Sequence, residues 1–470
     1  MAKQLDVWLL GSHIGTLSQV DGRLGFAYSA QWLDQAGAGN GIATEGAPGV
    51  APPSSPLSQS LPLRAEPFDD RATRPFFAGL LPEGDKRRLI AQALQVSRQN
   101  DFALLDGIGG ECAGAVTLLE PGQAPALAHV VTATRWLDDT DLLRLLDDMP
   151  QRPMLAGQQG LRLSLAGAQD KLPVVAIDDG RIGLPLNGAP STHILKPDIT
   201  GVDGSVFNEA FCMTLAAALK LNVATVRIQR VADRQFLLVQ RYDRLPTVET
   251  SAETSAEASA VAVAAPSDGA PVEVPQPQPP TRLHQEDFCQ ALGVPPEHKY
   301  QNEGGPDLAQ CFALLRLATR PSAPHILRLL DVVVFNALIG NHDAHGKNFS
   351  ILYGDKGGAG LAPLYDALST AVYPHLTDKM AMKIGGKYRF SEVMARHWEQ
   401  FARDAGLSPA QVKRRILEIA RRLPDLARDT QARFDAQGNS HPILGQIVAL
   451  TAQRCDLTIR RLTAPAADPA

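Results

Sequence analysis

The chain has 470 residues and a formal net charge of −5, with 44% hydrophobic and 20% charged residues. This composition is typical of a folded globular protein and excludes a wholly disordered chain, while the length predicts two or three packed units. The slightly acidic balance also excludes an overall basic surface for nucleic acid.

The sequence predicts neither a leader nor a membrane span, so we expect a cytoplasmic protein without membrane contact. The first residues, Met1–Asp6, lack the apolar stretch of a secretory signal, and no apolar run reaches the roughly eighteen residues that a span requires. The five cysteines show no metal-ligand spacing, which fits a reducing compartment. They are Cys112, Cys212, Cys289, Cys311 and Cys455.

Residues 1–150 are expected to form a small α+β module without catalytic spacing. Short apolar segments followed by glycine-containing turns predict strands at residues 5–10, 14–17 and 25–28. A segment rich in Gly, Ala, Pro and Ser follows, to about residue 62, and short helices are expected at residues 74–81, after residue 85, and at residues 101–105.

Residues 151–246 are expected to form a second unit, which begins with a strand, a small-residue turn and another strand. Leu161–Ser164 alternates in polarity, Leu165–Lys171 is the turn, and Leu172–Ile177 is apolar. Small side chains let backbone N–H groups approach phosphate oxygens, so this form suits a loop that covers phosphates. The spacing of a Walker motif is missing, and an ordinary hairpin is the alternative.

A lysine and a glutamate follow in the order seen in protein kinases. Lys196 ends the short apolar strand Thr192–Pro197, as does the kinase lysine that grips the α/β-phosphates. Glu209 begins an apolar helix over residues 206–219, where kinases place the glutamate that orients this lysine. Each residue alone also has a structural explanation, since lysines are common at strand ends and acids are favourable at helix starts.

Two further strands, at residues 226–231 and 236–239, are expected to run into Gln240–Arg244. This is where a hinge would join two lobes and meet an adenine ring. Residues 247–280 then change to repeated Ala, Ser, Thr, Glu and Pro, with few large apolar side chains. Such a segment cannot form a core, and we expect a disordered insertion at a lobe boundary.

Residues 281–465 are expected to be helical and to carry the catalytic loop. An apolar helix over residues 323–339 ends at Gly340 and is followed by Asn341–Asn348. Within this loop Asp343 precedes Asn348 by five residues, which is the kinase spacing of the acid that accepts a hydroxyl proton and the asparagine that holds a metal. A second acid, Asp366, follows a Gly-rich turn and suits a second Mg²⁺ ligand.

The residues so far predict phosphoryl transfer, with fixed positive charge around the phosphates from Lys171, Lys196 and Lys347. A zinc hydrolase is the alternative, because His342 and His345 flank an acid at a spacing compatible with a metal. No third clear ligand and no H-E-x-x-H helix accompany the two histidines.

Taken together, these segments resemble the HipA family, bacterial serine/threonine kinases that act as toxins of type II toxin–antitoxin modules. The resemblance rests on Ser164–Lys171, Thr192–Lys196, Asn208-Glu209, Arg241–Arg244, Ile339–Phe349 and Pro363–Ser369. It implies an α+β, two-lobed kinase-like fold, with a mixed α/β amino-terminal portion that contains an ATP-binding sheet and an all-helical carboxy-terminal lobe.

The resemblance also implies the roles of individual residues. Asp343 would be the proton acceptor, Asn348 and Asp366 would hold Mg²⁺, Glu209 would orient Lys196, and Ser164 would be autophosphorylated, which in the family expels the loop and switches the kinase off. ATP would be contacted by Ala166, Gly167, Ala168, Gln169, Asp170, Lys171, Lys196, Gln240, Arg241, Tyr242, His345, Gly346, Lys347, Asn348, Tyr365 and Asp366.

The partners implied by the resemblance are a HipB-like helix-turn-helix antitoxin, operator DNA through that complex, and a protein substrate. The family's best-known substrate is glutamyl-tRNA synthetase, an aminoacyl-tRNA synthetase. Three features depart from the family: Gln240 at the hinge, His342 before the acid, and the insertion at residues 247–280. The alternatives are a non-catalytic co-repressor that bridges antitoxin and DNA, and a small-molecule or lipid kinase.

Overall fold

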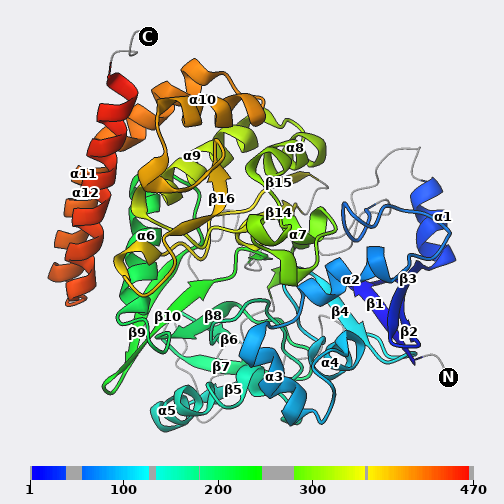
Figure 1. The fold of residues 1–470 in the computed structure, drawn as a ribbon. Coiled ribbons are helices and arrows are strands. Elements are labelled where there is room, and N and C mark those ends of the chain that lie inside the picture. Colours follow the sequence, from blue (N-terminus) through cyan, green and yellow to red (C-terminus); the bar gives the residue numbers. More distant parts are fainter. Residues whose placement is uncertain are drawn as a thin grey trace, which may run out of the picture.

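The computed structural model describes residues 3–38, 55–125, 134–178, 180–245, 280–354 and 358–464. The insertion expected at residues 247–280 lies outside these ranges except for its last residue. Figure 1 shows a mainly helical upper part, a sheet-containing lower part, and an amino-terminal module at one side. None of the helices in the described ranges is long and apolar enough to cross a membrane.

The amino-terminal module, residues 3–38 and 55–125, is built on a four-stranded antiparallel sheet in the order β3-β2-β1-β4. In β1 (Lys3–Leu9), alternate residues Leu5, Val7 and Leu9 are buried, as expected for a sheet with one covered face. The other strands are β2 (Ser12–Val20), β3 (Arg23–Tyr28) and β4 (Val116–Leu119), and the helices are α1 (Ala30–Ala38), α2 (Asp70–Gly79), α3 (Gly84–Ala93) and α4 (Asp101–Ile108). The predicted strands and helices of this module are therefore confirmed with shifted ends.

A six-stranded antiparallel sheet in the order β5-β7-β6-β8-β10-β9 forms the floor of the second unit. Its strands are β5 (Thr134–Leu137), β6 (Leu172–Ala176), β7 (Ile182–Pro185), β8 (His193–Pro197), β9 (Val226–Val231) and β10 (Arg234–Gln240), with α5 (Asp139–Asp148) beside β5. Thus β5, although within residues 1–150, pairs with a strand of the second unit.

Strand β10 separates two hydrophobic cores. Phe236 and Leu238 belong to the core shared with the amino-terminal module, whereas Leu237 and Val239 belong to the core shared with the helices. This follows from the alternation of side chains across a strand. Helix α6 (Ser205–Ala218) lies in the second core and carries the predicted Glu209.

The prediction of a strand at residues 161–164 is wrong. The segment makes only an isolated bridge between Leu163 and Glu111, and Ser164 N donates to Glu111 O at 2.9 Å. Its alternating pattern arises because Leu161, Leu163 and Leu165 are buried in the amino-terminal core rather than because it pairs in a sheet.

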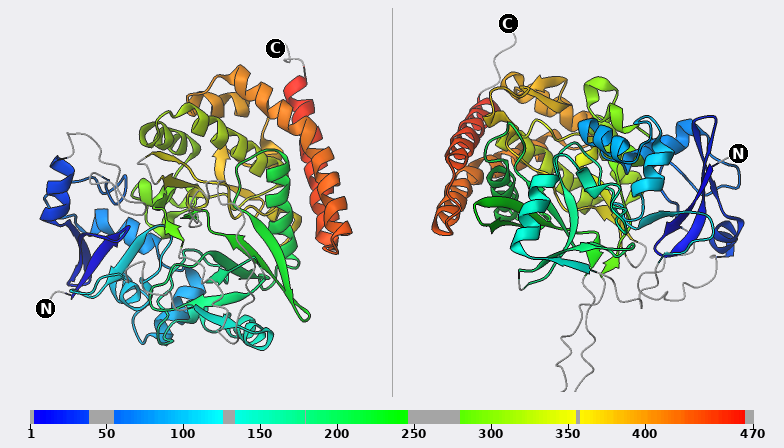
Figure 2. Two further views of the ribbon diagram at one scale, coloured as in Figure 1. Left: turned by 180° about the vertical axis from the view of Figure 1, so that it is seen from behind. Right: turned by 90° about the horizontal axis from the view of Figure 1, so that it is seen from below.

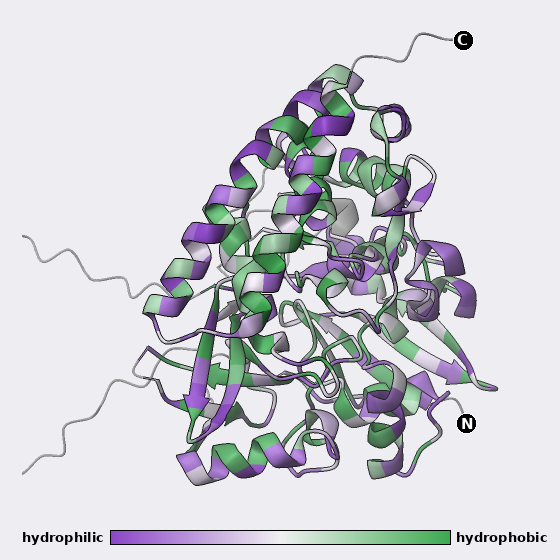
Figure 3. Ribbon diagram, turned by 60° about the vertical axis from the view of Figure 1, so that its left-hand side comes forward, coloured by the Kyte–Doolittle hydropathy of each residue, from purple (hydrophilic) through white to green (hydrophobic). Residues whose placement is uncertain are grey.

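The carboxy-terminal lobe, residues 280–464 as described, is dominated by helices. They are α7 (Phe288–Ala291), α8 (Leu308–Ala318), α9 (Ala323–Ile339), α10 (Ala395–Asp404), α11 (Pro409–Ala436) and α12 (Pro442–Thr463). Helices α11 and α12 run side by side along one edge of the molecule, as the views in Figure 2 also show. In Figure 3 hydrophobic and hydrophilic residues alternate along these two helices, as expected for helices that cover a core on one face.

The α+β class is confirmed, but this lobe is not all-helical. It also contains the sheet β13-β14-β15 and the hairpin β16-β17. These strands are β13 (Gln285–Asp287), β14 (Ser350–Tyr353), β15 (Ala359–Leu361), β16 (Lys379–Ile384) and β17 (Lys387–Arg389); the pair β11 (Arg244–Leu245) and β12 (Thr281–Arg282) precedes them. Strand β13 ends where α7 begins, and β14 begins just after the predicted catalytic loop. The pairing of β13 with β14 therefore places the end of that loop beside α7.

Candidate active site

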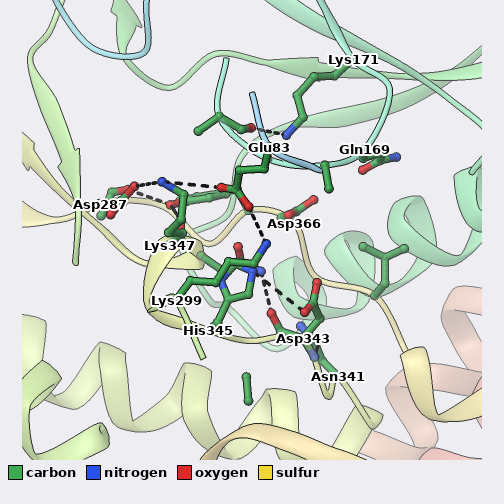
Figure 4. Close-up of a pocket in the computed structure, with 18 of the residues that line it drawn as sticks. Glu83, Gln169, Lys171, Asp287, Lys299, Asn341, Asp343, His345, Lys347 and Asp366 are labelled. Carbon is green, nitrogen blue, oxygen red and sulfur yellow. Dashed lines mark hydrogen bonds and ion pairs between the residues drawn. The ribbon is translucent and has the colours of Figure 1, made fainter. Parts of the chain in front are cut away.

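A pocket of about 730 Å³ lies between the six-stranded sheet and the carboxy-terminal lobe. Its walls bring together most of the residues predicted to bind ATP, although they come from segments far apart in the chain (Figure 4). The predicted residues that line it are Ala166, Gly167, Ala168, Gln169, Lys171, Lys196, Gln240, Arg241, Tyr242, Asp343, His345, Lys347, Asn348, Tyr365 and Asp366. Four predicted residues, Ser164, Asp170, Glu209 and Gly346, are not in this lining and are considered below.

Lys196 lies between two carboxylates. Its Nζ is 2.7 Å from Glu209 Oε1 and 2.7 Å from Asp366 Oδ1, and both Lys196 and Glu209 are buried. Strand β8 and helix α6 place this pair, and Asp366 comes from the segment after β15. Glu209 therefore contacts Lys196 from outside the pocket lining.

The charges of this group are strongly coupled. Burial alone would lower the pKa of Lys196, but the two carboxylates outweigh burial and raise it. Burial would likewise raise the pKa of Asp366, but the positive charges of Lys196 and Lys171 lower it. Asp366 therefore remains ionised. Its backbone has φ 58°, a left-handed conformation that is unfavourable for aspartate and is commonly retained at functional sites.

The catalytic loop, Asn341–Asn348, is held by its own hydrogen bonds. Helix α9 ends at Gly340, whose φ of 80° lets the chain turn out of the helix. Asn341 then accepts from Asp343 N through its side-chain oxygen at 3.0 Å, and Asn348 Nδ2 donates to Asp343 O at 3.0 Å. The backbone on both sides of Asp343 is thus fixed before any ligand binds.

The side chain of Asp343 faces the pocket and is 51% exposed. Tyr300 donates its hydroxyl hydrogen to Asp343 Oδ1 at 2.6 Å, and His345 Nε2 is 3.9 Å from the same oxygen. Burial lowers the pKa of His345 to about 3, so this ring is neutral at physiological pH. Tyr300 was not predicted from the sequence, because no motif links it to a loop 43 residues away.

His342 has a structural role that accounts for its position beside the acid. Its Nδ1 is 2.9 Å from Thr377 O and its Nε2 is 3.0 Å from a guanidinium nitrogen of Arg454 on α12. Both ring nitrogens are therefore engaged, which leaves none for zinc. Among the residues that the structure describes, no group of three His, Cys, Asp or Glu side chains is arranged to hold a metal ion. The zinc alternative has no support from this geometry.

Lys347 is anchored rather than free to follow a ligand. Its Nζ is 2.7 Å from Asp287 Oδ2, 3.1 Å from Gly79 O and 3.9 Å from Glu83 Oε1. Burial alone would lower the pKa of Lys347, but Asp287 and Glu83 raise it. Gly346, by contrast, is turned toward Cys289 and Pro306, which a Cβ at this position would meet at 2.8 and 2.9 Å. Gly346 therefore lies outside the pocket lining.

Through Glu83, the amino-terminal module contributes a side chain to the pocket lining. Glu83 lies in the turn between α2 and α3, and its Oε2 is 2.8 Å from Lys299 Nζ (Figure 4). Its backbone N donates to Gly167 O at 3.0 Å, so the same residue holds the phosphate loop, Leu165–Lys171. This contribution was not predicted, because residues 1–150 contain no catalytic spacing.

The phosphate loop is compact. Gly167 has φ 109°, a backbone conformation that favours glycine, and it lies against the end of the Lys171 side chain. Lys171 Nζ donates to Ala166 O at 2.7 Å. Asp170 instead pairs with Lys86 at 2.6 Å and lies outside the pocket lining, because its side chain is directed toward α3.

Ser164 is completely buried and does not face the pocket. Its Oγ donates to Leu80 O at 2.7 Å, and Leu80 belongs to the turn between α2 and α3. Phosphate transfer to this hydroxyl therefore requires the phosphate loop to leave its present position.

At the hinge, Gln240, Arg241 and Tyr242 line the pocket, and the Arg241 side chain is held in ion pairs. Its guanidinium is buried with Glu111 at 2.8 Å and Asp243 at 2.8 Å. Gln240 N and Arg241 N already donate to Thr225 O and Thr192 O. The Tyr242 and Tyr365 rings lie 5.6 Å apart beside this segment and offer flat apolar surface for a base.

The donors in this pocket fit Mg²⁺ bound to a nucleotide. Asp366 has one oxygen on Lys196 and Asn348 uses its amide nitrogen on Asp343 O, which leaves a carboxylate oxygen and an amide oxygen. Hard oxygen ligands of this kind, completed by phosphates and water, suit Mg²⁺. Lys196, whose pKa the neighbouring carboxylates raise, supplies positive charge beside them, and Lys171, whose pKa burial lowers, lies close by.

Comparison with known proteins identifies relatives along nearly the whole chain. Residues 163–427 match the family described as the HipA-like C-terminal domain, and residues 47–119 match the HipA N-terminal domain. A putative kinase of Sinorhizobium fredii, Y4mE, is 47% identical over 418 residues, covering 88% of this chain and 89% of the relative.

Two further matches, one in sequence and one in structure, come from Shewanella oneidensis. The serine/threonine-protein kinase toxin HipA is 29% identical over 379 residues and covers 78% of this chain and 79% of its own. A solved structure of the toxin–antitoxin system HipA, HipB and its operator DNA complex aligns with a TM-score of 0.74 and 25% identity, covering 97% of this chain and 98% of that one.

Proposed function

Because the chain belongs to the HipA family of serine/threonine-protein kinases, we propose that it transfers the γ-phosphate of ATP, with Mg²⁺, to a protein hydroxyl as the toxin of a type II toxin–antitoxin module. The observation that carries the proposal is the convergence of Lys196, Asp343, Asn348 and Asp366 on one pocket. Each has the chemistry that its predicted role needs, and the four come from three separate segments of the chain: strand β8, the loop Asn341–Asn348 and the segment after β15.

In this proposal Asp343 accepts the proton of the acceptor hydroxyl, and Asn348 and Asp366 hold the metal. Lys171 and Lys196 bind phosphate oxygens, and Glu209 orients Lys196. The rings of Tyr242 and Tyr365 pack against the adenine base. Bound Mg²⁺ supplies neutralisation of the phosphate charge. The rigid catalytic loop supports this assignment, since phosphoryl transfer depends mainly on alignment and fixed charge.

We propose that Ser164 is the autophosphorylation site and that its modification switches the kinase off. The buried position of the hydroxyl against Leu80 supports this idea, because a phosphate dianion has no room or counter-charge there. Once phosphorylated, the loop would be unable to return to the closed form.

We propose that the physiological partners are a HipB-like helix-turn-helix antitoxin and, through it, operator DNA. The relative whose solved complex contains HipB and operator DNA supports this inference. For the substrate we propose a translation-related protein, with glutamyl-tRNA synthetase as the specific candidate, in the cytoplasm.

Phosphatase-treated wild-type protein and Asp343→Ala, incubated with radiolabelled ATP and Mg²⁺, test the proposal. We expect label on Ser164 of the wild type, located by mass spectrometry, and none on Asp343→Ala. A wild type that binds ATP without becoming labelled would contradict the kinase proposal. Expression of the wild type alone should also arrest growth while Asp343→Ala does not; equal growth at equal expression would contradict the toxin assignment.

A further inference from the structure

We infer that Glu83, Lys299 and Tyr300 form a positioning relay that orients Asp343, so that the amino-terminal module takes part in setting the acceptor side of the site. The inference rests on the proposed function and deepens it. It assigns three residues that no kinase motif in the sequence includes.

The last contact of the relay is the hydrogen bond from Tyr300 to Asp343 Oδ1 at 2.6 Å. The terminal torsion of an aspartate is broad, so a carboxylate without a fixed partner rotates readily. When one oxygen is held, the other has a defined direction. Half of the Asp343 side chain remains exposed toward the pocket, where an acceptor hydroxyl must approach.

Tyr300 itself is held in a defined orientation. It lies in the acceptor-side loop, residues 296–303, between two short 3₁₀ turns. Its ring meets His345 edge-on, with centroids 5.1 Å apart and an interplanar angle of 85°, and Lys299 Nζ lies 5.4 Å from the ring centroid. Lys383 N also donates to Gln301 Oε1 at 2.7 Å, which ties the loop to β16.

The first contact of the relay crosses between distant parts of the chain. Lys299 Nζ and Glu83 Oε2 are 2.8 Å apart although the residues are separated by 216 positions, and each side chain is only 15% exposed. An ion pair this well shielded from solvent holds its geometry better than a surface pair. Glu83 N also donates to Gly167 O. This one residue therefore links the phosphate loop to the acceptor-side loop, which holds Asp343.

A second ion pair between the same two parts of the chain allows a positioning role of Glu83 to be distinguished from a role in packing alone. This pair, Arg74–Glu297, joins the same module to the same loop but lies at the surface, where the Glu297 side chain is 50% exposed. It does not lead to Asp343. Glu297→Gln is therefore a matched control for Glu83→Gln.

The kinetic test measures Ser164 labelling as a function of ATP concentration for wild type, Tyr300→Phe, Glu83→Gln and Glu297→Gln. We expect Tyr300→Phe and Glu83→Gln to lower the maximal rate about tenfold or more while the ATP concentration for half-maximal rate changes less than about twofold. Glu297→Gln should match the wild type. An unchanged maximal rate in Tyr300→Phe, or an equal loss in Glu297→Gln, would overturn the relay.

A spectroscopic test is independent of kinase activity. Protein containing 3-fluorotyrosine at its seven tyrosines gives a fluorine NMR resonance for Tyr300, assigned by its loss in Tyr300→Phe. This resonance should move in Asp343→Asn and in Glu83→Gln but not in Glu297→Gln. If the chemical shift of the Tyr300 resonance is unchanged in Asp343→Asn or in Glu83→Gln, the relay is refuted even if the protein is an active kinase. Absence of labelling with these shifts intact would instead refute the proposed function.

Discussion

At Lys196 a single ammonium group contacts two carboxylates, that of the buried Glu209 and that of Asp366, whose side chain is 29% exposed. Glu209 lies behind it and Asp366 beside it, both at 2.7 Å. Lys171 also lowers the pKa of Asp366, but less than Lys196 does. Lys196 thus serves the stability of the empty protein as well as the binding of a nucleotide.

Replacing Lys196 by methionine is accordingly expected to have two effects. The free energy of unfolding should fall by about 3–5 kcal/mol, because one partner of a buried ionic group is removed and the acids remain. Nucleotide affinity should fall at least tenfold. Urea unfolding and titration with a fluorescent ATP analogue measure the two quantities. Lys413→Met, on the exposed face of α11, should change neither, and a Lys196→Met protein as stable as the wild type would contradict the argument.

The residues of the site differ in how visible they are in the sequence. Asp343, Asn348 and Asp366 lie in short motifs whose spacing reflects local chemistry, and the pocket contains all three. Tyr300 contacts Asp343, which is 43 positions away, and Glu83 contacts Lys299, which is 216 positions away. A single sequence carries no signal for such tertiary contacts. The partners of His342, which are Thr377 and Arg454, are likewise 35 and 112 positions away in the chain.

At the scale of elements, the turn between α2 and α3 is the main support of the phosphate loop. Leu80 O accepts from Ser164, Glu83 N donates to Gly167 O, and Lys86 pairs with Asp170. Local pattern predicted the two helices and the small-residue loop correctly, but the strand expected before the loop is absent. Alternating polarity reports alternating burial, and burial here comes from a neighbouring module rather than from a sheet.

The position of Ser164 under this turn leads to a prediction about negative charge. Ser164→Asp should displace the phosphate loop, because an unpaired carboxylate in this buried site costs more than the loop's few hydrogen bonds return. We expect nucleotide affinity to fall at least tenfold, measured by calorimetric titration with ATP and Mg²⁺. Ser164→Ala is the control and should retain affinity within about threefold, since it removes one hydrogen bond and adds no charge. Tight ATP binding by Ser164→Asp would show that the closed loop tolerates charge.

At the scale of the whole molecule, the amino-terminal module and the carboxy-terminal lobe also meet through buried polar contacts away from the pocket. Glu286 on β13 is 1% exposed and accepts hydrogen bonds from Ser58, from Gln59 N at 3.0 Å and from the Tyr353 hydroxyl. The α+β class followed from sequence pattern, but this junction did not. It joins residues more than two hundred positions apart.

The junction makes stability depend on pH. Burial raises the pKa of Glu286 to about 7 despite the hydrogen bonds that oppose the shift, so the folded protein binds a proton here more tightly than the unfolded chain does. A raised pKa contributes stability that is fully present below the unfolded pKa, near 4.5, and is lost as pH rises through 7. The wild type should therefore lose about 3 kcal/mol of unfolding free energy across this window through Glu286 alone.

Glu286→Gln cannot ionise and should not share this loss. Its hydrogen bonds are poorer than those of the glutamate, so we expect it to be less stable than the wild type at pH 5. Between pH 5 and pH 8 the unfolding free energy of the wild type should fall by about 3 kcal/mol relative to that of Glu286→Gln. Urea unfolding at matched ionic strength measures both values. Glu66→Gln, at an exposed position, is the control. A difference that stays constant from pH 5 to pH 8 would mean that Glu286 keeps its charge on folding, and that the two parts meet through an ionised carboxylate.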